Sequence, residues 1–296
     1  MNLTSTEIQR PAKMDNRGGL GIQSSASLSE RMAVETPDII NPQTIHTAVP
    51  HRLEIVSIEP GSSCAGCLGP KSNLCAKVQE KLEGADWLSG QMRLESSVQI
   101  IPPRRSIYHP KEWSEFIPII CQGWAASSIT LPDGRRQILS FVLPGDLVST
   151  AGFLEPMSGR TVEAITEVTY RKFKRSELKA FMFAHPDLMD VLSKTLVEER
   201  MEADQLALDL GRRPADERIA RLILRLVKKL AGRGMMSDRT MEFPLRQRHI
   251  TDATGLTPVH VSKMMGEFQR NGLIEISARS LTILNETELY RIADWR

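Results

Sequence analysis

The sequence predicts an α+β protein of three successive parts: a β-roll of the jelly-roll type, a long helix, and a C-terminal winged helix-turn-helix. Three patterns predict this order. Short apolar runs alternate with turn residues between positions 98 and 173, and apolar residues recur every three or four positions from Leu188 to Leu210. A Gly-Leu-Thr-Pro turn then separates two short helical patterns after His249.

The composition is that of a globular chain with about two domains. Its 296 residues are 41% hydrophobic and 25% charged, which excludes a wholly disordered chain, a collagen and a coiled-coil rod. No apolar run approaches the roughly 18 residues that a membrane helix needs, and the polar start lacks the apolar core of a secretion signal. We therefore expect a cytoplasmic protein without a membrane partner.

Local composition divides the chain into five segments. Residues 1–60 mix Gly, Ser and Pro without periodicity, which predicts a disordered tail. Residues 61–89 hold three cysteines in a Gly-rich loop, followed by a helix from about Ala76 to Leu88. The remaining segments are the β-roll at 90–185, the long helix at 186–211 and the winged helix-turn-helix at 212–296.

The β-roll is predicted by short strands at near-regular spacing with Pro-Gly and Asp-Gly turns between them. Leu131-Pro132-Asp133-Gly134-Arg135 is typical of a hairpin tip, because Gly supplies the positive φ that tight hairpin turns need. One apolar run at Val162–Phe173 closes the set.

The long helix has a clear start and an amphipathic pattern. Pro186 suits the first helical position and Gly211 suits a C-cap. Residues at steps of three or four form one stripe: Leu188, Leu192, Leu196, Glu199, Ala203, Leu206 and Leu210. We expect this stripe to face a second copy of the chain, because the opposite face is charged; packing within its own domain is the alternative. The sequence does not explain Glu199 on the stripe.

Charge is distributed unevenly along the chain. Between Arg212 and Ser280, fourteen Lys and Arg stand against seven Asp and Glu, a net charge of +7, so the rest carries −5 of the total of +2. A basic C-terminal third on a mildly acidic body is typical of a nucleic-acid-binding module, although a solvated basic face gives the same count.

The pattern around residues 249–265 favours the nucleic-acid interpretation. Gly255 permits the tight turn of a helix-turn-helix, Thr257 is a good N-cap, and Pro258 suits the first position of the second helix. In such a unit the second helix lies in the major groove with its N-terminal residues on base edges. Alternating residues after Gly272 predict a two-stranded wing.

Several side chains of this unit are candidates for contacts with double-stranded DNA. Lys263 can donate to guanine, Val259 can touch a thymine methyl, and Ser262 can contact a base or a phosphate. His260 can donate to either, or it merely caps the helix. Arginines around the two helices suit phosphates. The full set is Arg246, Arg248, Thr257, Val259, His260, Ser262, Lys263 and Arg270.

These parts in this order resemble the CRP/FNR family of bacterial transcription regulators over roughly residues 90–290, and its FNR/FixK-like branch in particular. Gly123-Trp124, the hairpin tip and Pro144-Gly145-Asp146-Leu147 resemble its β-roll, which is of the cyclic-nucleotide-binding type. The resemblance implies a homodimer that binds a two-fold symmetric DNA site and controls RNA polymerase. Val259 and Lys263 replace a Glu and an Arg of the best-known oxygen-sensing members, so we do not carry over their DNA half-site.

Three cysteines precede the β-roll. Cys64, Cys67 and Cys75 form a C-x2-C-x7-C pattern, and clustered thiolates suit an iron–sulfur cluster or zinc. Three structural cysteines in a loop are the alternative. The FNR branch holds an oxygen-labile [4Fe–4S] cluster at this place, so the resemblance implies the same cofactor here.

The resemblance leaves the fourth cluster ligand open, because the family's position for it corresponds to Arg171. Cys121 is our candidate, since its strand is expected to pair with the strand at Val168–Arg171, and paired strands lie only about 4.8 Å apart. A buried, inert Cys121 is the alternative.

A cyclic nucleotide is the competing input signal. The cyclic-AMP pattern of the family has Gly-Glu-Leu and then Arg-Ser, where this chain has Gly145-Asp146-Leu147 and Arg160-Thr161. Arg160 and Thr161 suit a phosphate, but Asp146 is shorter than the ribose-binding Glu. We rank this input below the cluster because it leaves the three cysteines unexplained.

An iron–sulfur enzyme or electron carrier is a further class. The sequence holds no Ser-His-Asp arrangement, HExxH motif or phosphate-binding Gly loop, so we expect a protein that is not an enzyme.

Overall fold

The computed structural model describes residues 96–109, 114–154 and 159–295, together with Leu74, Lys77, Val78, Glu80 and Lys81. All of them belong to one compact unit that begins at Arg52. The tail predicted at 1–60 and the cysteines Cys64, Cys67 and Cys75 lie outside the described residues. Leu74 is already helical, so the helix expected from about Ala76 begins earlier.

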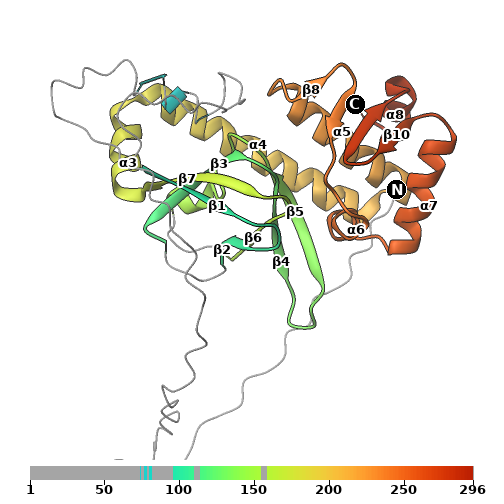
Figure 1. The fold of residues 1–296 in the computed structure, drawn as a ribbon, viewed down its shortest axis with the longest axis horizontal. Helices are drawn as coiled ribbons and strands as arrows, with labels where there is room; N and C mark the ends of the chain where they lie inside the picture. Colours follow the sequence, from blue (N-terminus) through green and yellow to red (C-terminus); the bar gives the residue numbers. More distant parts are fainter. Residues whose placement is uncertain are drawn as a thin grey trace, which may run out of the picture. The chain divides into compact units, whose positions relative to one another are not determined.

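Two antiparallel sheets form the predicted β-roll, with strand orders β1-β7-β3 and β2-β6-β4-β5 (Figure 1). The strands are β1 (Ser96–Ile101), β2 (Ser106–Tyr108), β3 (Phe116–Gln122), β4 (Ala125–Thr130), β5 (Arg136–Val142), β6 (Thr161–Ala164) and β7 (Val168–Lys174). A short helix α2 (Ala151–Leu154) lies between β5 and β6. The hairpin tip is confirmed: Leu131 N donates to Arg135 O at 2.8 Å, and Gly134 has a φ of 86°.

The apolar run at Val162–Phe173, expected as one segment, is two strands in different sheets. The chain turns between them because its backbone is bonded to the β3–β4 turn. Ile165 N donates to Trp124 O at 2.7 Å, and Trp124 N donates to Thr166 Oγ1 at 2.9 Å. These bonds replace sheet pairing at the point where the chain changes sheets.

Helices α3 (Arg175–Ala184) and α4 (Pro186–Arg212) follow the roll. Pro186 begins α4 as expected, but Gly211 lies inside its last turn and the C-cap is Arg213, so the predicted cap is wrong. The helix ends at Arg212, two residues before Pro214, because a proline disfavours helical backbone in the residue before it; Arg213 has a φ of −84° and a ψ of 144°. No described helix is long and apolar enough to span a bilayer.

The N-terminal part of the stripe on α4 packs within its own chain, which is the alternative that the sequence left open. Leu188 and Leu192 are buried in a hydrophobic cluster with β3, β7 and α3, and Leu196 packs against that cluster. Glu199 is no defect, because its carboxylate accepts a hydrogen bond from the buried Thr150 hydroxyl of the roll. Periodicity identified an apolar face but not its partner.

The C-terminal domain consists of a helical unit and a small sheet of order β10-β11-β9-β8. Its elements are α5 (Ala215–Ala231), β8 (Met236–Ser237), β9 (Thr240–Glu242), α6 (Gln247–Thr254), α7 (Pro258–Arg270), β10 (Ile274–Ser277), β11 (Ser280–Ile283) and α8 (Glu286–Ile292). The helix-turn-helix is α6 and α7, and the wing is β10 and β11, as the sequence predicts.

One hydrophobic cluster joins the roll to the C-terminal domain. Trp124, Phe141 and Leu143 of the roll belong to the same cluster as the apolar face of α5. At one end of this contact, Arg136 Nη2 lies 2.8 Å from Asp252 Oδ2, so an ion pair also joins β5 to α6. The roll therefore contacts the helix-turn-helix directly.

We predict that Gly123→Ala destabilises the protein by at least about 3 kcal/mol, because it combines backbone strain with a clash. Gly123 has a φ of 86°, and an added Cβ would lie 2.1 Å from Glu167 O. Gly134 has the same φ, but no atom lies within 4 Å of its added Cβ, so Gly134→Ala should cost only about 1 kcal/mol. Urea unfolding of both variants measures the difference, and equal losses would contradict the role of the close approach.

Candidate nucleic-acid interface

The turn of the helix-turn-helix has the geometry that its sequence predicts. Gly255 ends α6 with a left-handed φ of 66°. Thr257 caps α7, where its hydroxyl accepts a hydrogen bond from His260 N, and Pro258 begins the helix. Gln247 Nε2 donates to Pro258 O at 2.5 Å, which ties the start of α6 to the start of α7.

The face of α7 that points away from the core carries the predicted base-reading side chains. Val259 is 76% exposed, and Ser262 and Lys263 are exposed beside it. Thr257 Oγ1 lies 3.0 Å from His260 Nδ1, so the imidazole of His260 is held at the helix start. A valine this exposed on an ordered helix is available to a partner surface.

Predicted phosphate-contacting arginines surround this helix. Arg246, Arg248 and Arg270 are all exposed. His249 between the first two is buried, and its Nδ1 accepts a hydrogen bond from Arg246 N at 3.1 Å. The imidazole therefore takes the place of the Glu or Gln of a capping box, which avoids a carboxylate between the arginines.

The environment of His249 keeps it neutral. Burial, together with the positive charges of Arg248, Arg136 and Arg246, lowers its pKa to about 4. Arg136 belongs to the β-roll, so residues of both domains act on this one imidazole.

Sequence reasoning missed Gln247 and Arg279. Arg279 is exposed at the tip of the wing, and its carbonyl accepts a hydrogen bond from Phe243 N at 2.6 Å, so the tip lies beside the segment that leads to Arg246. The residue before it, Ala278, has a φ of 53°. The signal in the sequence is a basic residue between the two predicted strands of the wing, where Arg279 stands.

The candidate cluster ligands are only partly described. Cys121 is 9% exposed on β3, and its thiol lies 3.8 Å from Ile119 O. The expected strand pairing is confirmed: β3 pairs with β7, with Ile119 opposite Arg171 and a register shift at Cys121. Among the described residues, no group of three or more His, Cys, Asp or Glu side chains is arranged to hold a metal.

The residues considered for nucleotide binding interact with different parts of the protein. Gly145 has a φ of 91° in the turn after β5. The Asp146 carboxylate that follows it is bonded to Arg233 and Lys229 of the C-terminal domain. Arg160 and Thr161 lie at the start of β6, where the charge of Arg160 acts on Glu199 of α4.

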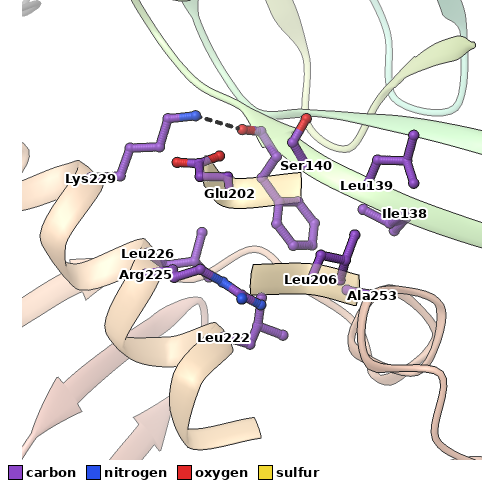
Figure 2. Close-up of a pocket in the computed structure, with 11 residues that line it drawn as sticks. Ile138, Leu139, Ser140, Glu202, Leu206, Leu222, Arg225, Leu226, Lys229 and Ala253 are labelled. Carbon is purple, nitrogen blue, oxygen red and sulfur yellow. Dashed lines mark hydrogen bonds between the residues drawn. The ribbon is translucent and has the colours of Figure 1, made fainter. Parts of the chain in front are cut away.

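A small cavity of about 50 Å³ lies where the two domains and α4 meet (Figure 2). Its walls come from β5, α4, α5 and Ala253 of α6. The Lys229 ammonium spans one edge and donates to Phe141 O at 3.2 Å. The cavity is too small for a nucleotide, because drug-sized ligands occupy about 300 Å³ or more.

Comparison with known proteins matches each of the two domains to a protein family. Residues 98–185 match the cyclic nucleotide-binding domain family, and residues 217–292 match the Crp-like helix-turn-helix domain family. The chain belongs to the CRP/FNR family. It is a transcription regulator of the CRP/FNR type, as its relatives are.

Relatives within the CRP/FNR family include regulators from several bacteria. The chain is 27% identical to the nitrogen fixation regulation protein FixK of Bradyrhizobium diazoefficiens over 244 residues, 81% of this chain and 98% of that protein. It is 28% identical to the transcriptional activator protein FnrA of Stutzerimonas stutzeri over 54% of this chain and 65% of that protein. The structure of FixK2 from Bradyrhizobium japonicum matches with a TM-score of 0.60 and 27% identity, covering 67% of this chain and 98% of that one.

We predict that this CRP/FNR protein loses up to about 3 kcal/mol of stability between pH 6.5 and pH 4 through His249 alone. The pKa of His249 is about 4 in the fold and about 6.5 in the unfolded chain, so unfolding takes up a proton across this range. The contribution is complete above pH 6.5 and disappears as the pH falls to about 4.

Urea unfolding of His249→Gln measures this contribution, because a glutamine accepts the same Arg246 N–H bond but does not titrate. The stability of the variant should fall less steeply than that of the wild type over this range. Parallel curves would show that another group causes the acid sensitivity.

Proposed function

We propose that this chain is a homodimeric, sequence-specific DNA-binding regulator that responds to oxygen or redox state through a [4Fe–4S] cluster. The observation that carries the DNA-binding part is the exposed face of α7, where Val259, Ser262 and Lys263 stand clear of the core on a helix that Thr257 and Gln247 hold at its start. Such a face is built to enter the major groove.

The roles of the individual residues follow from their positions. Lys263 donates to a base edge, Val259 contacts a thymine methyl, and Ser262 and His260 bond a base or a phosphate. Arg246, Arg248, Arg270 and Thr257 bond the phosphate backbone, and we add Arg279 of the wing to this group. Bound in this way, the dimer contacts RNA polymerase at its promoters.

A second copy of the chain contacts the face of α4 opposite the predicted stripe. Val197, Met201 and Leu208 on that face are 59%, 63% and 41% exposed. Their spacing of four and then seven residues is that of a coiled-coil seam. Three large apolar side chains aligned in solvent are typical of an association surface.

The cluster part is supported by packing near Cys75 and Cys121. Leu74, the neighbour of Cys75, is buried with Val78 in the hydrophobic cluster that contains Ile119, two residues before Cys121. The buried thiol of Cys121 on β3 and the packing of Leu74, next to Cys75 in the sequence, support one set of four ligands: Cys64, Cys67, Cys75 and Cys121. Four thiolates are the usual ligand set of such a cluster, which supplies oxygen-sensitive chemistry when bound.

The same packing joins Leu74 and Val78, which stand on either side of Cys75 in the sequence, to α4. Leu74 and Val78 share their hydrophobic cluster with Leu188 and Leu192, and Lys81 Nζ lies 3.2 Å from Asp187 Oδ2 at the helix start. Loss of order in the cysteine segment removes these contacts and weakens the dimer. DNA binding then falls, because two linked half-site contacts bind far more tightly than one.

We predict that Arg279→Ala weakens binding to all DNA sequences and lowers the salt dependence by about two units per dimer, one for each wing. Lys263→Ala instead relaxes the choice of one base pair, at a cost of about 1–3 kcal/mol. Fluorescence anisotropy at several salt concentrations measures both, on a duplex selected by the wild type from a random pool.

Arg239→Ala is the matched control for Arg279→Ala. Arg239 also follows a residue with a φ of 53°, Asp238, but it lies in the β8–β9 turn, where its carbonyl accepts from Ile283 N. That turn is at the opposite end of the β9–β11 pair from the wing tip. The salt dependence of DNA binding by Arg239→Ala should therefore match that of the wild type. A wild type that selects no duplex would overturn the proposed DNA binding.

We predict that protein purified without oxygen absorbs broadly near about 400 nm and that air bleaches this band. Cys121→Ser should lower the iron and sulfide content, whereas Ile119→Val, which changes the packing of the same strand, should keep it. Unchanged iron in Cys121→Ser would remove Cys121 from the ligand set. A colourless protein containing zinc, or one that responds only to a cyclic nucleotide, would end the oxygen-sensing proposal and leave DNA binding intact.

A further inference from the structure

The turn after β5 is held by two cations from the end of α5. Arg233 Nη1 donates to Pro144 O at 2.6 Å, and its Nη2 pairs with Asp146 Oδ1. Lys229 Nζ lies 3.1 Å from Asp146 Oδ2 and also donates to Phe141 O. Two side chains of the C-terminal domain thus bind the carboxylate and two backbone carbonyls of the roll.

The turn itself is rigid, so these contacts fix the position of α5. Asp146 N donates to Leu143 O, and Leu143 N donates back to Asp146 Oδ2, both at 2.9 Å. The turn is also bonded to β3, because Gly145 N donates to Ile120 O and Ile120 N donates to Asp146 O. The turn is thus bonded into the roll, and Lys229 and Arg233 connect it to the C-terminal domain.

The electrostatics favour the ionised carboxylate. Burial by itself raises the pKa of Asp146, but Lys229 and Arg233 outweigh it, and the pKa lies below its ordinary value. Removal of both cations would leave a largely buried carboxylate unpaired, which costs more than removal of the carboxylate together with its partners.

We propose that Asp146 is a positioning residue for DNA binding: it fixes the C-terminal domain on the β-roll and so presets the separation of the two recognition helices in the dimer. Asp146 stands where the cyclic-AMP pattern of the family has the ribose-binding Glu. Here the chain's own Arg233 and Lys229 take the carboxylate instead of a nucleotide. This inference rests on the proposed function.

The Asp146 contact lies away from the DNA-binding face, so its loss should affect binding to two half-sites but not to one. The exposed face of α7 makes none of these bonds, so a change at Asp146 leaves the contacts with one half-site intact. Simultaneous contact with two half-sites requires the DNA-binding domains of the two subunits to be held at a fixed separation. The extra affinity of binding both half-sites is lost when these domains move freely.

The test compares full-length wild type and Asp146→Asn by fluorescence anisotropy on two duplexes. One is the palindromic duplex that the wild type selects from a random pool, and the other has one half-site scrambled. We expect Asp146→Asn to bind the palindrome at least about tenfold more weakly and the scrambled duplex within about twofold of the wild type. Asp133→Asn, at the exposed hairpin tip where the carboxylate pairs with Arg135 of the same turn, should match the wild type on both.

A double-mutant cycle separates positioning from general damage. Arg233→Gln added to Asp146→Asn should weaken palindrome binding by clearly less than the sum of the two single losses, because both changes break the same ion pair. Equal weakening on both duplexes, additive losses, or unchanged binding by Asp146→Asn would overturn the proposal. Calorimetric binding of cyclic AMP or cyclic GMP that requires Asp146 would overturn it as well.

A separate readout distinguishes this inference from the proposed function. If the wild type selects no duplex, the proposed function fails, but the contact can still be measured by hydrogen exchange. Asp146→Asn should then raise the exchange of the Leu143 amide and of the last turn of α5, while the α7 amides keep their protection. Unchanged exchange at both places would contradict the anchoring itself.

Discussion

Burial of Trp124 and Phe141 against helix α5 is the contact on which the rest of this structure depends. The two rings meet edge to face with centroids 6.5 Å apart and lie in the same cluster as the core of the C-terminal domain. Aromatic side chains of this size bury a large apolar area, but they do little to fix the orientation of the C-terminal domain on the roll. Orientation comes from the polar contacts at the two ends, Arg136 with Asp252 and Asp146 with Arg233. Without the aromatic contact these pairs would be exposed to water and would contribute little.

The basic charge of the C-terminal domain serves two purposes. Some of its cations are neutralised inside the protein: Arg221 and Arg225 pair with Asp209 at the end of α4, and Arg233 pairs with Asp146. These cations hold the domain to the rest of the chain and contribute little field outside it. The charge available to a phosphate backbone is therefore smaller than the net +7 and is concentrated on the exposed arginines around α6, α7 and the wing.

Local features were predictable from the sequence and long-range partners were not. The hairpin tip and the turn at Gly255 depend on backbone conformations that one or two residues determine, and both have the expected form. The stripe on α4 was expected to face a second copy, but its N-terminal part packs within its own chain, because spacing reports an apolar face and not what covers it. The true exposed face was hidden by the charged residues around Val197 and Met201. Asp146 looked like a ligand residue because its partner, Arg233, is 87 positions away.

The close approach of Gly255 to Leu210 means that, in the proposed dimer, the length of α4 affects the position of the recognition helix. A Cβ on Gly255 would lie 3.0 Å from Leu210 Cδ2, so the turn between α6 and α7 rests on the end of the long helix. Each residue added to α4 advances that end by about 1.5 Å and rotates it by about 100°. A change in the length of α4 would therefore change the separation and orientation of the two recognition helices in the proposed dimer, even with an unchanged α7.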